Sequence, residues 1–479
     1  MQGRTTIERR PVGSFALVVG CLAVLVPSPI LAQPAPKTLQ EALIQAYSTN
    51  PTLLAERANL RATDENVPAA MAGWKPQVSI SAFAGLAKGN IITHSTVPVI
   101  PTTTTSWNSR GVNSESILVN QPLYRGGQTV AGINRAQNQV WGERARLIDQ
   151  EQTTFGTVIS AYVNVIQSEQ VLALNINNEQ VLARQLQATN DRFRVGEITR
   201  TDVAQAEAAL AQATATRQSA EGTLQTARAA FQQVVGVYPG KLIEPQPLRL
   251  PAKTLEEAKT FSSKNNPKVV AALFDDAAAK DNFDLQYAKL MPTLALQGQL
   301  IRNEDTTNKN QTTNTGQITA NLSIPIYQGG TEYAAIRQAR QIQQQTRQKL
   351  DEARRTAIQA LVTSWSTYQS AKAAIESTRQ SVRANEVALE GTQREAIVGS
   401  RTTLDVLNAE QLLLNARVTL VQNLASFVNA SYQVAAAVGR LTARDLNLQV
   451  ALYDETAYHS AVRNRWIGTG DYATDQPGR

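Results

Sequence analysis

The fold is decided by a stretch of sequence that occurs twice in the chain, VGEITRTDV at residues 195–203 and VGSRTTLDV at residues 398–406. In both copies a glycine suits the left-handed end of one helix, and a Thr-x-x-Asp capping box suits the start of the next. No proline occurs between Pro122 and Pro239 or between Pro325 and Pro477, so long helices can form on both sides. Each stretch therefore predicts the tip of a long antiparallel helical hairpin.

The helix that returns from each tip has a heptad pattern. Large apolar residues at one seam position alternate mainly with alanine at the other, beginning with Val203 and Ala206 in the first hairpin and Val406 and Ala409 in the second. Such alternation favours close knobs-into-holes packing. The outgoing stretch from Tyr124 to Arg192 has the length for a helix of roughly 100 Å at 1.5 Å per residue. The hairpins are therefore predicted to be long rods.

The repeat continues outward from the hairpins. The motif PLYRGG at residues 122–127 matches PIYQGG at residues 325–330. Both motifs predict a sharp strand-to-helix bend at their glycine pairs, which are Gly126, Gly127, Gly329 and Gly330. A phosphate-binding loop is excluded because no Gly-Lys-Ser/Thr follows. Tyr124 and Tyr327 are interpreted either as aromatic residues at a membrane surface or as core residues.

Earlier landmarks recur as well. The motif TLQEA with Asn50-Pro51 returns as TLEEA with Asn266-Pro267, and each predicts a helix of about 35 residues, at 39–74 and 255–290. The first copy carries 13 extra residues between Pro76 and Pro122. An insertion confined to one interval indicates a loop in open space. We divide the chain into a first repeat (33–250), a second repeat (251–446) and a C-terminal tail (447–479).

Short segments between the first helices and the bends alternate apolar and polar residues. This pattern is typical of outer-membrane strands, predicted at about 77–86, 112–121, 293–301 and 316–326. Loops rich in Thr, Asn and Ser are expected at 85–110 and 302–315 and would face outside the cell. Four strands cannot close a barrel, because open edges in lipid leave backbone groups unpaired. Three chains are therefore expected to pool twelve strands.

The first 32 residues are interpreted as a secretory signal peptide, with arginines before an apolar run and a small-residue cleavage site. Cys21, the only cysteine, leaves a lipoprotein cleavage box as the alternative reading. The mature chain then has no disulfide. Its basic residues form no block suited to nucleic acid.

With its duplicated motifs, the chain resembles the TolC family of outer-membrane efflux and secretion proteins from about Thr38 to Leu446. The resemblance implies an α plus transmembrane β fold, a trimeric 12-stranded β-barrel continuous with a long α-helical coiled-coil barrel. It implies a homotrimer in the outer membrane of a Gram-negative bacterium, with a long periplasmic extension. This duct would dock on a periplasmic adaptor and an inner-membrane ABC or RND pump. The Pro-rich residues 239–251 and the chain after Gly439 would form a belt around the helical barrel.

The tips carry the functional hypothesis, in which they form the periplasmic mouth. Asp405 and Asn408 would line an ion ring, and the resemblance assigns a closing latch to Arg401, Thr201 and Asp202. The outermost residues would contact the adaptor; these are Val195, Gly196, Val398 and Gly399. The sequence departs from some relatives at two positions. Asn408 stands where they carry a second acidic residue, and Ala396 stands where they carry a tyrosine of the latch. The alternative interpretation is that Asp202 and Asp405 only cap helices.

An enzyme is not expected, and neither a cofactor nor a metal site is predicted. The two histidines, His94 and His459, have no convincing nucleophile or ligand cluster beside them in the sequence. The rival hypotheses are a coiled-coil periplasmic adaptor and a surface adhesin, but neither explains two hairpins that each follow a pair of strands. The sequence leaves small-molecule efflux and type I protein secretion as open alternatives for the cargo.

Overall fold

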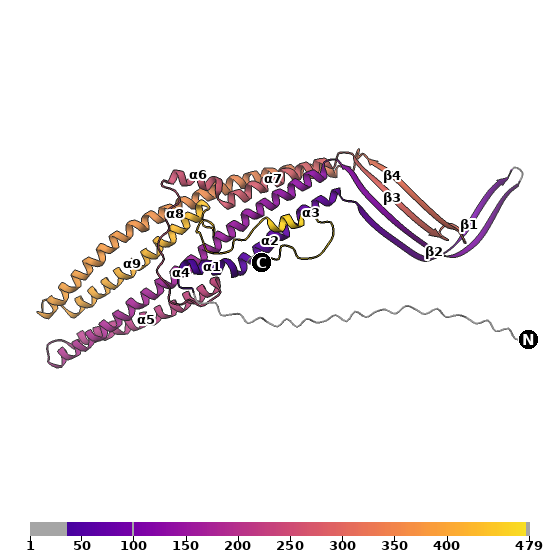
Figure 1. Ribbon diagram of the computed structural model, residues 1–479. Coiled ribbons are helices and arrows are strands. Elements are labelled where there is room, and N and C mark those ends of the chain that lie inside the picture. Colours follow the sequence, from indigo (N-terminus) through magenta and orange to yellow (C-terminus); the bar gives the residue numbers. More distant parts are fainter. Residues whose placement is uncertain (1–35, 98–99, 476–479) are drawn as a thin grey trace, which may run out of the picture. The chain divides into compact units, whose positions relative to one another are not determined.

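The computed structural model describes residues 36–97 and 100–475. The predicted signal peptide, with Cys21, lies outside the described residues. Two copies of one element order make up the described chain, each with short helices, a pair of strands and a long helical hairpin (Figure 1).

The first helices of each repeat are shorter than predicted. Asn50 and Asn266 end one helix and begin the next, and the amide oxygen of Asn50 accepts a hydrogen bond from the Thr52 N–H at 3.0 Å. The proline that follows has no N–H with which to continue the preceding helix. The prediction of single 35-residue helices was therefore wrong. The observed elements are α1 (Leu39–Thr49), α2 (Pro51–Asp64), α3 (Asn66–Met71) and η1 (Ala72–Trp74), then α6 (Leu255–Asn265) and α7 (Pro267–Ala288).

Four antiparallel strands form one sheet in the order β1-β2-β3-β4. They are β1 (Gln77–Val97), β2 (Ile100–Arg125), β3 (Thr293–Glu304) and β4 (Thr312–Ser323). The loop predicted at 85–110 is wrong, since β1 and β2 pair from Gln77↔Asn120 to Val97↔Ile100. The extra residues of the first repeat therefore lengthen this hairpin. The loop predicted at 302–315 shrinks to residues 305–311, and β4 ends before Pro325, which cannot donate to the ladder.

The two faces of the sheet differ in polarity. One face exposes large apolar side chains from all four strands, among them Val78, Ile117, Leu300 and Ile318. On the other face the amide groups of neighbouring strands bond to each other, as in Asn321 to Gln297 at 2.6 Å. This is the apolar-out, polar-in alternation of an outer-membrane barrel. Within the described chain β1 and β4 each have one unpaired edge.

The long hairpins are formed by α4 (Gln128–Arg194) with α5 (Arg200–Val235), and by α8 (Thr331–Ile397) with α9 (Thr403–Val438). Helix α4 also packs against α9, which joins the two hairpins (Figure 1). Val203 and Ala206 are buried in the predicted seam. The polar residues of the seam have partners on the opposite helix of their hairpin. Arg217 Nε pairs with Glu179 Oε2 at 2.8 Å, and Asn423 donates to Thr378 Oγ1 at 2.9 Å. No helix in the described segments combines the length and apolar character that a membrane span requires.

The largest core cluster lies where α1, α4 and α5 meet the segments that follow each hairpin. Tyr162 and Phe231 are buried there, and the Tyr162 hydroxyl oxygen lies within hydrogen-bond distance of two carbonyls, those of Lys37 at 2.9 Å and Ile243 at 2.7 Å. Arg57 is also buried, with its guanidinium 4.5 Å and 5.1 Å from the ring centroids of Tyr47 and Tyr453. The segment before α6 and the tail are therefore bound to the helices.

The tail continues along α2 through α10 (Ala457–Val462). The Tyr458 hydroxyl donates to Glu65 at 2.9 Å, and His459 Nδ1 lies 3.2 Å from Asp64 Oδ1. Asp64 is 1% exposed, and its burial raises the pKa of the carboxyl to about 7. Burial also lowers the pKa of His459. The folded state therefore binds a proton on Asp64 more tightly than the unfolded chain does.

Asp64→Asn is expected to stabilise the protein more at pH 8 than at pH 5. Because the pKa of Asp64 is raised in the folded state, ionisation of its carboxyl lowers the free energy of unfolding as the pH rises from about 4 to about 7. Asparagine cannot ionise and so removes this loss, while its side-chain oxygen still accepts a hydrogen bond from His459. The midpoint temperature of thermal unfolding of the purified protein, followed by circular dichroism, measures the effect. An equal gain at both pH values contradicts the titration of Asp64 as its cause.

Candidate functional site: the hairpin tips

Both tips have the same backbone. Gly196 and Gly399 each have φ +80°, and the following residues bond back to the end of the outgoing helix. Glu197 N donates to the Arg192 carbonyl at 3.0 Å, and Ser400 N donates to the Glu395 carbonyl at 3.0 Å. These bonds satisfy carbonyls that a helix end leaves without partners. A side chain at either glycine position would be strained.

A reciprocal capping box begins each returning helix. Asp405 Oδ2 accepts from the Thr402 N–H at 2.9 Å and from its hydroxyl at 2.8 Å, while Asp405 N donates to Thr402 Oγ1 at 3.2 Å. Asp202 and Thr199 form the same box. The hydrogen bonds from Thr402 lower the pKa of Asp405, and those from Thr199 lower the pKa of Asp202. Both carboxylates are therefore charged at neutral pH.

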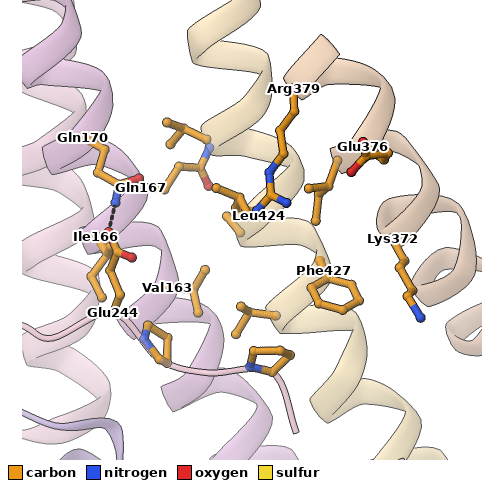
Figure 2. A pocket seen from close by; sticks show the side chains of 16 residues that line it. Val163, Ile166, Gln167, Gln170, Glu244, Lys372, Glu376, Arg379, Leu424 and Phe427 are labelled. Atoms are coloured by element: carbon orange, nitrogen blue, oxygen red, sulfur yellow. Dashed lines mark hydrogen bonds between the residues drawn. The ribbon is translucent and has the colours of Figure 1, made fainter. Parts of the chain in front are cut away.

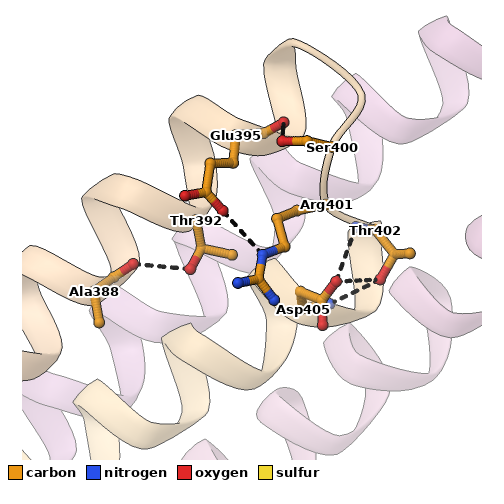
Figure 3. Close-up of polar contacts among 7 residues, drawn as sticks. All are labelled: Ala388, Thr392, Glu395, Ser400, Arg401, Thr402 and Asp405. Atoms are coloured by element: carbon orange, nitrogen blue, oxygen red, sulfur yellow. Dashed lines mark hydrogen bonds and ion pairs between the residues drawn. The ribbon is translucent and has the colours of Figure 1, made fainter.

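Arg401 is bonded within its own hairpin. Its Nε donates to Glu395 Oε2 at 2.9 Å, and the guanidinium lies between Glu395 and Asp405 (Figure 3). The charge of Arg401 contributes to the lowered pKa of Asp405. Arg401 and Asp405 are thus close in space, and the positive charge offsets part of the negative charge at the tip.

The two tips reverse the order of their charges. Arg192 pairs with Glu197 at 2.5 Å in the first tip, whereas Glu395, at the position of Arg192 in the repeat, pairs with Arg401 in the second. Sequence reasoning missed Glu395, Arg192 and Glu197. Aligning the two repeats would have shown the reversal, but the pairings across each turn appear only in the structure.

The remaining predicted site residues take separate places. Asn408 is exposed one turn after Asp405, and Thr201 is exposed in the first turn of α5, outside the capping box. Val195 and Val398, at the tips, are 77% and 78% exposed. At the other end of the hairpins, Tyr124 and Tyr327 are also exposed. The four bend glycines have positive φ angles, of 62° (Gly126), 88° (Gly127), 70° (Gly329) and 85° (Gly330).

A groove of about 470 Å³ lies between the hairpins, where α4, α8 and α9 meet residues 244–247 (Figure 2). Its floor is apolar, with Val163, Ile166, Leu424 and Phe427, and charged side chains of α8 lie at its rim. Its lining includes no histidine, cysteine, serine or threonine. Among the described residues, no group of three or more His, Cys, Asp and Glu side chains is placed to hold a metal ion. His94 lies in β1, bonded to Thr103, and was wrongly predicted in a loop.

Comparison with known proteins identifies this architecture. The family described as outer membrane efflux protein matches residues 42–237 and 262–440. The chain belongs to the outer membrane efflux protein family. It is 34% identical to the outer membrane efflux protein BepC of Brucella suis, over 90% of this chain and 92% of that protein. It is 24% identical to the outer membrane protein TolC of Escherichia coli, over 86% and 84% of the two chains.

Solved structures share the fold. The outer membrane protein VceC of Vibrio cholerae superposes with a TM-score of 0.71 at 20% identity, over 84% of this chain and 96% of that one. The CmeC outer membrane channel of Campylobacter jejuni gives a TM-score of 0.72 at 15% identity, over 84% and 85%. The predicted fold class, with a barrel of pooled strands above a helical tunnel, is confirmed.

Outer membrane efflux proteins of this family are homotrimeric channels that pair with periplasmic adaptors and inner-membrane pumps. The predicted outer-membrane location with a periplasmic helical tunnel is confirmed. The protein is therefore an exit duct for efflux or secretion and not an adaptor or adhesin. Its relatives are channel proteins rather than enzymes.

Proposed function

We propose that the hairpin tips of three copies close the periplasmic end of the duct, with Arg401, Thr201 and Asp202 as the latch. The observation that carries this proposal is unused hydrogen-bonding capacity. In the described chain only Nε of Arg401 is bonded, so both terminal nitrogens remain available. The capping boxes occupy Oδ2 of Asp202 and leave Oδ1 available. A guanidinium and a carboxylate with free atoms on neighbouring hairpins form strong charge-assisted bonds.

The latch need not break the hairpin's own bonds. Arg401 keeps Glu395 through Nε while it reaches a neighbour through Nη1 or Nη2, and Asp202 caps α5 while it accepts from outside. Closing and opening then exchange only the outer bonds. The charge reversal between the two tips favours this arrangement. First and second hairpins alternate around the proposed duct, so the Arg192–Glu197 pair of one tip neighbours the Arg401–Glu395 pair of the next, in which the charges are exchanged.

The mouth is lined by Asp405 and Asn408. They are three residues apart on α9, so both side chains lie on one face of the helix. Three copies of Asp405 around one axis form a ring that attracts cations and repels anions. Asn408 contributes no charge, and Arg401 offsets part of the charge of Asp405. The ring is therefore only moderately selective.

The exposed valines of the tips are the surface for the adaptor. Val195 and Val398 lie beside the turn glycines and are apolar side chains with little contact in the described chain. Two apolar points on each subunit give six around a trimer, suited to a ring of adaptor tips. We propose that the duct itself is passive, in line with relatives that are channel proteins rather than enzymes.

Arg401→Ser is expected to raise the single-channel conductance of the trimer in a planar bilayer, because the outer bonds of the latch are lost. Arg354→Ser is the matched control, since Arg354 is an exposed arginine of α8 far from the tip that pairs with Asp351. It should leave the conductance at the wild-type value. An unchanged conductance in Arg401→Ser rules out its latch role.

Asp405→Asn is expected to weaken block of the channel by hexaamminecobalt(III) added on the periplasmic side. The asparagine oxygen keeps the bonds from Thr402, so the cap survives and only the charge is removed. Asn408→Asp should have the opposite effect and strengthen the block. Asp405→Ala should also weaken it, with the cap lost as well. Equal block in wild type and Asp405→Asn removes the ring hypothesis.

The cargo that we propose is small molecules. The efflux protein BepC is the relative at 34% identity, whereas the protease secretion protein PrtF of Dickeya chrysanthemi is 25% identical over 65% of this chain. Deleting the gene should lower the inhibitory concentration of amphiphilic drugs and dyes several-fold, and the wild-type gene should restore it. Unchanged susceptibility together with loss of a secreted protein from the medium would favour type I secretion.

A further inference from the structure

The C-terminal tail approaches the start of the first membrane strand. The tail runs from the end of α2 toward β1. Tyr458 and His459 contact Glu65 and Asp64, respectively, and further along the tail the Arg465 carbonyl contacts Lys75. Lys75 Nζ donates to the Arg465 carbonyl at 2.7 Å and lies 5.4 Å from the Trp466 ring centroid. The short helix α10, the yellow helix near the label α2 in Figure 1, contacts α2.

Lys75 lies directly below the sheet. It is two residues before the first residue of β1, and three residues before Val78 on the apolar outer face, a span of about 10 Å at 3.3 Å per residue. The preceding residue, Trp74, is tied to the sheet, because its carbonyl accepts from Gln121 Nε2 of β2 at 3.0 Å. The tail is therefore held at the level where the barrel enters the periplasmic leaflet.

The tail turns its apolar side chains outward at this level. Val462 is buried against the helices, but Trp466 is 67% exposed and Ile467 is 90% exposed. Trp466 and Ile467 lie beside Lys75 and Arg465, and Trp74, which precedes Lys75 in the chain, is also exposed. The guanidinium of Arg465 lies 3.8 Å from the ring centroid of Tyr472, which fixes the position of this segment.

We propose that Trp466 and Ile467 insert into the periplasmic leaflet of the outer membrane as an anchor, with Lys75 and Arg465 at the anionic phospholipid headgroups. Tryptophan prefers the interface between headgroups and acyl chains, and basic side chains extend from that depth to the phosphates. Only three residues separate Lys75 from Val78 on the lipid-facing side of β1, so the anchor and the strand enter the same leaflet. The anchor fixes the depth of the tail, and through His459 and Asp64 that of α2.

The proposal is tested with a nitroxide label at Ile467→Cys in the full-length trimer, in vesicles of phosphatidylethanolamine and phosphatidylglycerol. Cys21 is the only cysteine of the chain and lies in the predicted signal peptide, so the mature protein supplies a background without cysteine. Two labelled controls bracket the result. Ile318→Cys lies on the apolar face of β4 and is 79% exposed, and Val195→Cys is at a hairpin tip.

The label at 467 is expected to collide more often with oxygen than with the water-soluble nickel complex NiEDDA, as at 318 and opposite to 195. A preference for NiEDDA overturns the proposal. Low collision rates with both reagents also overturn it, because they place the residue behind a neighbouring subunit. Conductance does not enter the measurement, so the result is independent of the proposed latch.

The role of the basic residues is tested by replacing phosphatidylglycerol with phosphatidylcholine. The ratio of oxygen to NiEDDA collisions at 467 is expected to fall, because the headgroups that attract Lys75 and Arg465 are removed, whereas the ratio at 318 stays constant. An unchanged ratio at 467 overturns the charge component of the anchor.

Discussion

The pairing of backbone groups at the edges of the sheet is the constraint on which the rest of the structure depends. Hydrocarbon offers no partner for an unpaired N–H or C=O, so the free edges of β1 and β4 must meet edges from other copies. This requirement makes assembly with other copies obligatory, and channels of this family assemble as trimers. Once three sheets close, the helices that follow the Gly126 and Gly329 bends are placed around the same axis, and the two hairpins of each chain become staves of one tunnel.

The tunnel is uniform in backbone and varied in charge. Both tips use the same positive-φ glycine and the same Thr–Asp box, so their geometry is fixed by local bonds that do not depend on neighbours. Side chains that do not serve the backbone are free to differ, and Glu395 stands where the first repeat has Arg192. A duplicated scaffold can thus carry the proposed gate without weakening its own turns.

The membrane end is tied to the helical end by long-range contacts of the tail. Arg57 between two tyrosine rings, His459 beside Asp64 and Lys75 at the Arg465 carbonyl all join residues about 390 positions or more apart. They bind the last segment of the chain along the first helices. The tail is therefore packed against the helices along its path from the core cluster to the periplasmic end of the sheet.

The sequence by itself determined the repeat, the hairpins, the tips and the four strands, because these follow from local periodicity and from caps made by residues three apart. The prediction from sequence missed the helix breaks at Asn50 and Asn266, because helical periodicity continues across the proline that begins the next helix. The prediction also placed a loop at residues 85–110, since this part of the β1–β2 hairpin is polar and lacks the apolar alternation by which strands are recognised.

Tertiary structure alone decided the contacts between distant or non-periodic residues. Arg401 reaches Glu395 across a turn of six positions, a spacing that no helix or strand pattern predicts. The burial of Asp64 depends on a histidine 395 positions away. The exposure of Trp466 beside the sheet likewise depends on the path of the whole tail, because burial is a property of the packed chain and not of a local segment.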